Sequence, residues 1–191
     1  MTQLLIRLFI RQPDRAQDPK VRAAYGNLAG AVGMVCNILL CIGKLTVGTL
    51  FGSIAITADA LNNLSDASSN VVSLVGFKLA SKAPDAEHPF GHARYEYLAG
   101  LVVSVTILGI GFSLLKESVV KVLHPTAVVF SWLTVAVLIA SILVKLWMSV
   151  FNRTIGRIIS SETLIATAAD SRNDVLSTGA VLVSTILCRL T

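Results

Sequence analysis

The sequence is poor in charged and aromatic residues. Only 14% of its residues are charged and 6% are aromatic, whereas 54% are hydrophobic. A soluble domain usually carries about 25% charged residues. The shortage of charge therefore argues against a soluble protein, and the mean hydropathy of +0.74 favours a membrane protein.

Cysteine and proline are also scarce. The three cysteines, Cys36, Cys41 and Cys188, form no CxxC pair and lie in apolar stretches, so we interpret them as buried small side chains. The few prolines and aromatic residues exclude a disordered or all-β chain. The net charge of +5 does not predict binding of nucleic acid, because the basic residues flank apolar runs and do not form a stripe.

Long apolar runs are what the sequence does contain. A helix needs about 20 mostly apolar residues to cross a bilayer. Five stretches meet this requirement, and we predict all-α structure with membrane-spanning helices at residues 26–50, 53–79, 93–123, 130–151 and 161–190. Residues 26–191 are thus expected to form a polytopic transmembrane bundle in contact with lipid.

The segments outside the predicted spans have distinct patterns. Residues 1–25 are predicted to form an amphipathic segment on the membrane surface, with Arg7, Arg11 and Arg15 at four-residue spacing. Residues 152–157 are predicted as a short basic turn. Lys44 is expected to extend outwards to the membrane interface. Most basic residues outside the spans lie on the side of the N-terminus, which the positive-inside rule places in the cytoplasm.

Two acidic clusters interrupt the apolar runs. Asp170 and Asp174 lie four residues apart in the fifth predicted span, and Asn62 and Asp66 have the same spacing in the second. This spacing places both members of a pair on one face of a helix. A carboxylate at membrane depth costs about 2.5–3.5 kcal/mol, which indicates a function for the pairs. Both fall near the middle of their spans and would meet if the two helices are neighbours.

The four residues offer one amide oxygen and three carboxylates. Such a hard, all-oxygen set suits Mn²⁺, Mg²⁺ or Ca²⁺ better than Zn²⁺ or Cu⁺. Carboxylates also exchange protons for metal ions, as a metal–proton antiporter requires. We therefore predict that Asn62, Asp66, Asp170 and Asp174 form a metal site between the second and fifth helices.

Other interpretations of these residues remain open. The polar side chains can serve as contacts between helices, with Lys145 and Arg172 as cationic partners, and a structural role is favoured for Asp59. Three carboxylates exceed the cations available within the membrane, which argues against this role alone. An intramembrane aspartyl protease also needs two aspartates on separate helices. The Gly-x-Gly-Asp motif of such proteases is absent, so a transporter is favoured over an enzyme.

Three sequence motifs resemble the cation diffusion facilitator family. They read Asp59-Ala-Leu-Asn62-Asn-Leu-Ser-Asp66, His88-Pro-Phe-Gly-His92-Ala-Arg94-Tyr-Glu96 and Asp170-Ser-Arg-Asn-Asp174. The resemblance implies six transmembrane helices followed by a cytoplasmic ferredoxin-like domain, assembled as a homodimer. It further implies export of divalent metal ions from the cytoplasm by proton antiport with alternating access. The sequence contains five of the six helices and no such domain, so we expect a transmembrane fragment of this fold.

The resemblance also implies the roles of particular residues. The family's transport site maps onto Asn62, Asp66, Asp170 and Asp174, and zinc-transporting members usually have histidine there. The absence of histidine resembles the manganese-exporting bacterial members. We therefore expect Mn²⁺ as the transported ion in a bacterial inner membrane, with Zn²⁺, Fe²⁺ or Co²⁺ as the alternative and no other cofactor. The family's second site maps onto a loop cluster of Asp85, His88 and His92, whose residue types alone favour ordinary solvated loop positions.

Overall fold

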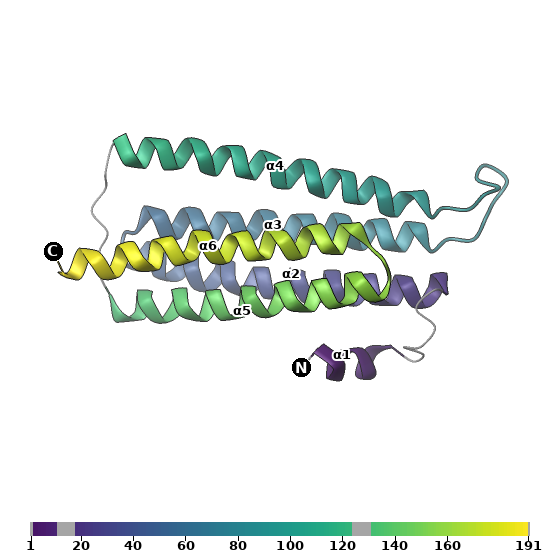
Figure 1. The fold of residues 1–191 in the computed structure, drawn as a ribbon, viewed down its shortest axis with the longest axis horizontal. Helices are drawn as coiled ribbons and strands as arrows, with labels where there is room; N and C mark the ends of the chain where they lie inside the picture. The colour runs from purple at the N-terminus through teal and green to yellow at the C-terminus, as the bar shows by residue number, and fades with distance from the viewer. Residues whose placement is uncertain (1, 11–17, 124–130, 191) are drawn as a thin grey trace.

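The structure, a computed structural model of residues 1–191, describes residues 2–10, 18–123 and 131–190. These residues form helices and contain no strand, which confirms the all-α prediction. The helices are α1 (Thr2–Phe9), α2 (Pro19–Leu50), α3 (Ile54–Ala80), α4 (Arg94–Leu123), α5 (Trp132–Ile158) and α6 (Glu162–Leu190) (Figure 1).

The five long helices run alternately in opposite directions and form a bundle (Figure 1). Each contains between 27 and 32 residues. At about 1.5 Å per residue, even the shorter ones exceed the hydrocarbon thickness of a bilayer. The closest packing joins α2 to α3 and α5 to α6, and contacts of α3 with α4, α4 with α6 and α2 with α5 complete a ring.

Two helix boundaries differ from the prediction. Helix α2 begins at Pro19 and not near residue 26, because Asp18 caps it by accepting a hydrogen bond from the Lys20 backbone N–H at 2.8 Å. The predicted turn at residues 152–157 is wrong, since α5 continues through Ile158. Asn152 and Ile155 are buried there, so tertiary packing holds this polar segment in the helix.

The chain reverses between helices at short turns. At residues 51–53, Gly52 has φ +63°, a left-handed conformation that glycine adopts without a steric penalty. Ser53 occupies the N-cap position of α3, although its side chain makes no capping hydrogen bond. The predicted loop before α4 is confirmed, and its Gly91 has φ +81°. The segment between the third and fourth predicted spans, residues 124–130, lies outside the described residues.

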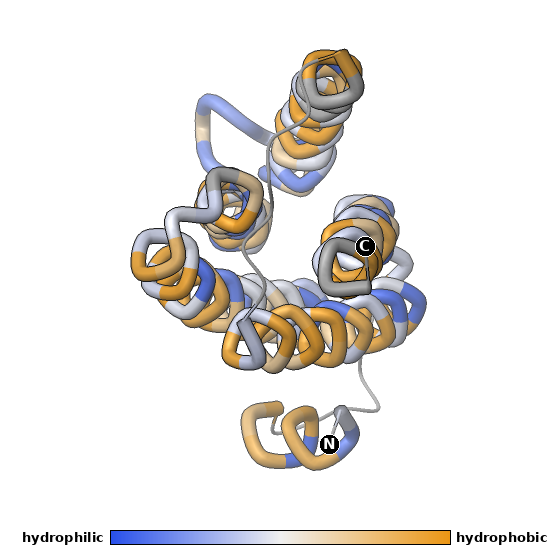
Figure 2. Tube along the Cα trace, turned by 90° about the vertical axis from the view of Figure 1, so that its left-hand side faces the viewer, coloured by the Kyte–Doolittle hydropathy of each residue, from blue (hydrophilic) through white to orange (hydrophobic). Residues whose placement is uncertain are grey.

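An apolar cluster closes one end of the bundle, where α2 begins and α5 ends. Ile6 and Ile10 from the N-terminal segment pack into it against residues such as Tyr25 and Phe151. Helix α1 lies to one side of the bundle (Figure 2). It exposes Leu8 among other apolar side chains, an arrangement that suits the predicted position on a membrane surface. Arg11 and Arg15 of the predicted amphipathic segment lie outside the described residues.

The long helices expose many large apolar side chains, such as Leu39, Leu101 and Leu143. Within the described residues, α2, Arg94–Ser113 of α4, and α5 are long and apolar enough to cross a membrane. Helices α3 and α6 carry the polar clusters, which lower their hydropathy. Exposed apolar surface on helices of this length indicates an integral membrane protein.

Candidate metal centre

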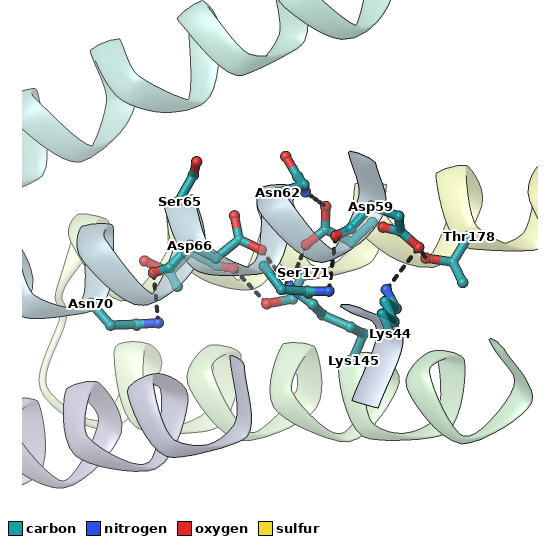
Figure 3. A network of polar contacts seen from close by, with 12 residues as sticks. Lys44, Asp59, Asn62, Ser65, Asp66, Asn70, Lys145, Ser171 and Thr178 are labelled. Carbon is teal, nitrogen blue, oxygen red and sulfur yellow. Dashed lines mark hydrogen bonds and ion pairs between the residues drawn. The ribbon is translucent and has the colours of Figure 1, made fainter. Parts of the chain in front are cut away.

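Helices α3 and α6 bring the two predicted clusters together. One carboxylate oxygen from each of Asp66, Asp170 and Asp174 lies within 4.8 Å of the others. Asn62 joins them by donating a hydrogen bond from Nδ2 to Asp174 Oδ1 at 3.0 Å (Figure 3). The second and fifth predicted spans are therefore neighbours, and the four predicted residues form one polar cluster.

The polar residues of α3 share one face, and the cluster is partly shielded within the bundle. Asp66 and Asp174 are only 5% and 6% exposed, and Asn62 and Asp170 are half-buried. Asn70 lies one turn beyond Asp66 and donates from Nδ2 to the Asp66 carbonyl at 2.9 Å. Asn70 lies on the same inward-facing side of α3 as Asp66. This local hydrogen bond gives its buried amide a partner.

Lys145 of α5 lies between two of the carboxylates (Figure 3). Its Nζ is 2.6 Å from Asp66 Oδ2 and 2.6 Å from Asp174 Oδ2, and its side chain is 1% exposed. The alternative interpretation, in which Lys145 pairs with the acidic residues, is thus correct for Asp66 and Asp174. Arg172 is exposed, and no contact joins it to the carboxylates in the part of the chain that the structure describes. With Lys145 charged, three carboxylates still leave a formal charge of −2.

A second ion pair lies beside the cluster. Lys44 of α2 is fully buried, and its Nζ is 2.8 Å from Asp59 Oδ2, which also accepts a hydrogen bond from the Thr178 hydroxyl at 3.3 Å. The expectation that Lys44 extends to the interface is wrong, because its α2 face packs into the bundle where Asp59 is available. These contacts support the predicted structural role of Asp59.

The amide of Asn62 faces the cluster with its NH₂ group. Because this NH₂ group donates to Asp174, the nitrogen of Asn62, and not its oxygen, contacts the carboxylates. The predicted role of Asn62 as an oxygen ligand therefore requires the amide to turn. In the present arrangement Asn62 and Lys145 both donate to Asp174, one to each of its oxygens.

The loop cluster of Asp85, His88 and His92 is also assembled, with one potential ligand atom from each within 4.8 Å of the others. His88 Nδ1 and His92 Nε2 lie 3.3 Å and 3.4 Å from the Asp85 carboxylate. The hydrogen bond from the His88 backbone N–H, at 2.7 Å, holds the pKa of Asp85 below its usual value. His92 is 7% exposed, so it differs from the solvated position that residue type alone favours.

Another contact ties helices together near this loop. Arg22 of α2 forms a two-pronged ion pair with Glu96 of α4, with Nη2–Oε1 at 2.8 Å and Nε–Oε2 at 2.9 Å. Arg22 also donates to the Ile159 carbonyl, where α5 turns towards α6. The sequence did not predict this pair, whose partners are 74 residues apart.

Comparison with known proteins identifies a family. Residues 31–191 match the cation efflux transmembrane domain. An uncharacterized transporter of Methanocaldococcus jannaschii, MJ0449, is 33% identical over 82% of this chain and 55% of its own length. The manganese efflux system protein MneS of Bacillus subtilis is 31% identical over 78% of this chain and 51% of its own length. The magnetosome protein MamM of Paramagnetospirillum magneticum is 31% identical over 82% and 50%.

The chain thus spans about half the length of the curated relatives it matches. The family match covers most of the chain, including α3 and α6 with their acidic clusters. We conclude that the chain belongs to the cation efflux transmembrane domain family.

Proposed function

We propose that this chain forms the ion-conducting part of a divalent metal efflux transporter. The observation that carries the proposal is the group of three carboxylates inside the bundle, two of them buried and Asp170 half-buried: Asp66, Asp170 and Asp174 have oxygens within 4.8 Å of one another. The three carboxylates carry a formal charge of −3, of which the Lys145 ammonium offsets only one unit, so the group attracts a further cation. Acidic residues inside a membrane bundle typically mark an ion pathway.

Mn²⁺ is the ion that this ligand set favours. The cluster offers carboxylate oxygens and contains no histidine or cysteine, and such hard ligands suit Mn²⁺ better than Zn²⁺. The relative MneS, named a manganese efflux system protein, supports the same choice. Competition between Mn²⁺ and Zn²⁺, Fe²⁺ or Co²⁺ for transport distinguishes this proposal from the alternative ions.

Coupling to protons follows from the same ligands. Carboxylates that release a metal ion can take up protons in its place, so the cluster supports metal–proton antiport. The basic residues near α1, the loop before α4 and the end of α5 support a cytoplasmic N-terminus. We further propose a bacterial inner membrane location, a homodimeric whole protein, and a second ion at the loop cluster of Asp85, His88 and His92.

Removal of one carboxylate tests this proposal. We expect Asp174→Ala to abolish Mn²⁺ efflux in vesicles, because Asp174 contacts both Asn62 and Lys145 within the cluster. Transport is measured as Mn²⁺ flux under an imposed proton gradient. The matched control is Glu162→Ala, which removes an exposed carboxylate from the same helix and should leave the flux close to that of the wild type. Full transport by Asp174→Ala would rule out the assigned site.

A further inference from the structure

We propose that Lys145 is a tethered cation that holds the empty metal centre closed, and that its ammonium group and a divalent ion exclude each other there. This inference rests on the proposed function and adds a specific competitor to it. Lys145 comes from α5, whereas the proposed ligands come from α3 and α6. A third helix therefore supplies the group that an entering ion has to displace.

The distances place the ammonium where an ion would bind. Lys145 Nζ is 2.6 Å from an oxygen of Asp66 and 2.6 Å from an oxygen of Asp174. Hard divalent cations bind oxygen at about 2.0–2.6 Å. An ion coordinated by the same two oxygens would thus lie within a few ångströms of Nζ, in a buried site where repulsion between cations is strong.

The hydrogen bonds to Asp174 lead to the same conclusion. Its Oδ1 accepts from Asn62 and its Oδ2 accepts from Lys145, so each oxygen already has a donor. A neutral amide such as that of Asn62 can stay hydrogen-bonded to a metal-bound carboxylate, whereas the charged Lys145 ammonium repels the entering cation. Lys145 is suited to withdraw, because its flexible four-carbon stem lets the ammonium move while the helix stays in place.

Exchange between the two cations also keeps the carboxylates paired. A buried carboxylate without a partner is strongly destabilising. With Lys145 in place, Asp66 and Asp174 are paired in the absence of metal. When a divalent ion enters, it takes over this role as the ammonium leaves. The lysine thus stabilises the empty centre at the expense of affinity for the ion.

The experiment is a comparison of Mn²⁺ binding at one pH and one salt concentration. Mn²⁺ affinity is measured by electron paramagnetic resonance on the purified chain in lipid nanodiscs. We expect Lys145→Gln to bind Mn²⁺ at least tenfold more tightly than the wild type. Lys145→Arg retains the positive charge and should not bind more tightly. Unchanged or weaker binding by Lys145→Gln would overturn the proposal.

Lys44→Gln serves as the matched control for the loss of a buried positive charge. Lys44 pairs with Asp59, outside the three-carboxylate group, so its removal measures the general electrostatic effect alone. We expect a smaller gain in affinity for Lys44→Gln than for Lys145→Gln. Equal gains would show that Lys145 acts as a distant charge and not as a competitor for the same oxygens.

A further variant separates this inference from the proposed function. Asp174→Asn in the Lys145→Gln background should remove the tight binding. If binding persists, Mn²⁺ is bound elsewhere and the proposed site itself is wrong. If Asp174→Asn removes binding from the wild type but Lys145→Gln does not tighten it, the site stands and the role of Lys145 is wrong.

The wild-type chain provides a readout that does not depend on the folding of a variant. In its Mn²⁺-loaded structure, we expect Lys145 Nζ to have left both of the oxygens that it contacts at 2.6 Å in the present structure. A loaded structure that retains both contacts would contradict mutual exclusion.

Discussion

At the scale of single residues, the three carboxylates of the cluster are not equivalent. Asp66 and Asp174 share the Lys145 ammonium. Asp170, one turn from Asp174, has no ion pair or hydrogen bond from its side chain to another described residue. Its half-buried carboxylate is therefore the group most available to an entering ion.

Asn62 offers a test of ion selectivity at this scale. Its amide lies 3.0 Å from Asp174, at the edge of the carboxylate group. Because imidazole favours Zn²⁺, we expect Asn62→His to shift the ratio of Mn²⁺ to Zn²⁺ transport towards Zn²⁺. The ratio is measured by competition in proteoliposomes, with Asn62→Gln as the control that keeps the amide. An unchanged ratio in the histidine variant would exclude Asn62 as a selectivity residue.

The loop cluster gives a prediction about pH. Backbone hydrogen bonding from His88 lowers the pKa of Asp85, so folding of the loop favours the charged carboxylate. The resulting stabilisation is complete above the ordinary pKa of about 3.9 and is lost as the pH falls through the lowered value. We expect a carbon-13 titration of the Asp85 carboxyl group to give a pKa below 3.9. A midpoint at or above that value would contradict the hydrogen-bonded loop.

At the scale of elements, α2 and α3 pack closely because α2 presents glycines to its neighbour. A Cβ added at Gly26 would lie 2.2 Å from Phe77 Cγ, and one at Gly30 would lie 2.6 Å from Leu74 Cγ. Both distances are too short for real contacts, so these positions need the absence of a side chain. Small residues at helix contacts serve this purpose in membrane bundles.

Two alanine substitutions in α2 test this packing. We expect Gly26→Ala to reduce the free energy of unfolding by about 1–3 kcal/mol, because Phe77 has to move. Gly43 has no atom within 4 Å of an added Cβ, so Gly43→Ala should stabilise the helix by about 0.5–1 kcal/mol. Both values are measured by denaturant unfolding in mixed micelles. Equal effects of the two substitutions would show that α2 does not approach α3 at Gly26.

The helices could be predicted from the sequence wherever the length of an apolar run or the spacing of polar residues is sufficient to define them. Apolar length predicted the five long helices, and the residue spacing predicted the common face of Asn62 and Asp66. The end of α5 was not predicted, since Asn152 reads as polar turn sequence until the packing that buries it is known. The start of α2 was missed because Pro19 and Asp18 mark the true beginning before the apolar run.

At the scale of the whole molecule, polar and apolar contacts occupy different zones. The ion pairs of Lys44 and Lys145 lie among the long helices, whereas the apolar cluster that includes Tyr25 and Phe151 closes one end. The order of helices around the ring determines which residues meet. Spacing along the sequence does not contain that order. It allowed Lys145 as a partner of the acidic residues in general, but it could not give the partners of Lys44 and Arg22.

The buried lysines nevertheless left a signal in the sequence. A charged side chain inside a long apolar run is expensive unless it meets a partner of opposite charge. Lys44 and Lys145 each occupy such a position, and the spans also contained several unpaired aspartates. The sequence analysis used this signal for Lys145, as a possible partner of the acidic residues, but expected Lys44 at the interface. Only the arrangement of helices shows that Lys44 contacts Asp59.

The central claim is that Asp66, Asp170 and Asp174 hold a divalent metal ion. Anomalous diffraction from crystals grown with Mn²⁺ tests it most directly, with crystals of Asp170→Asn as the comparison. We predict an anomalous peak at about 2.0–2.6 Å from carboxylate oxygens of these three residues, and a weaker or absent peak in the variant. A Mn²⁺-loaded crystal with no peak among the three carboxylates, or with an undiminished peak in Asp170→Asn, would contradict the claim.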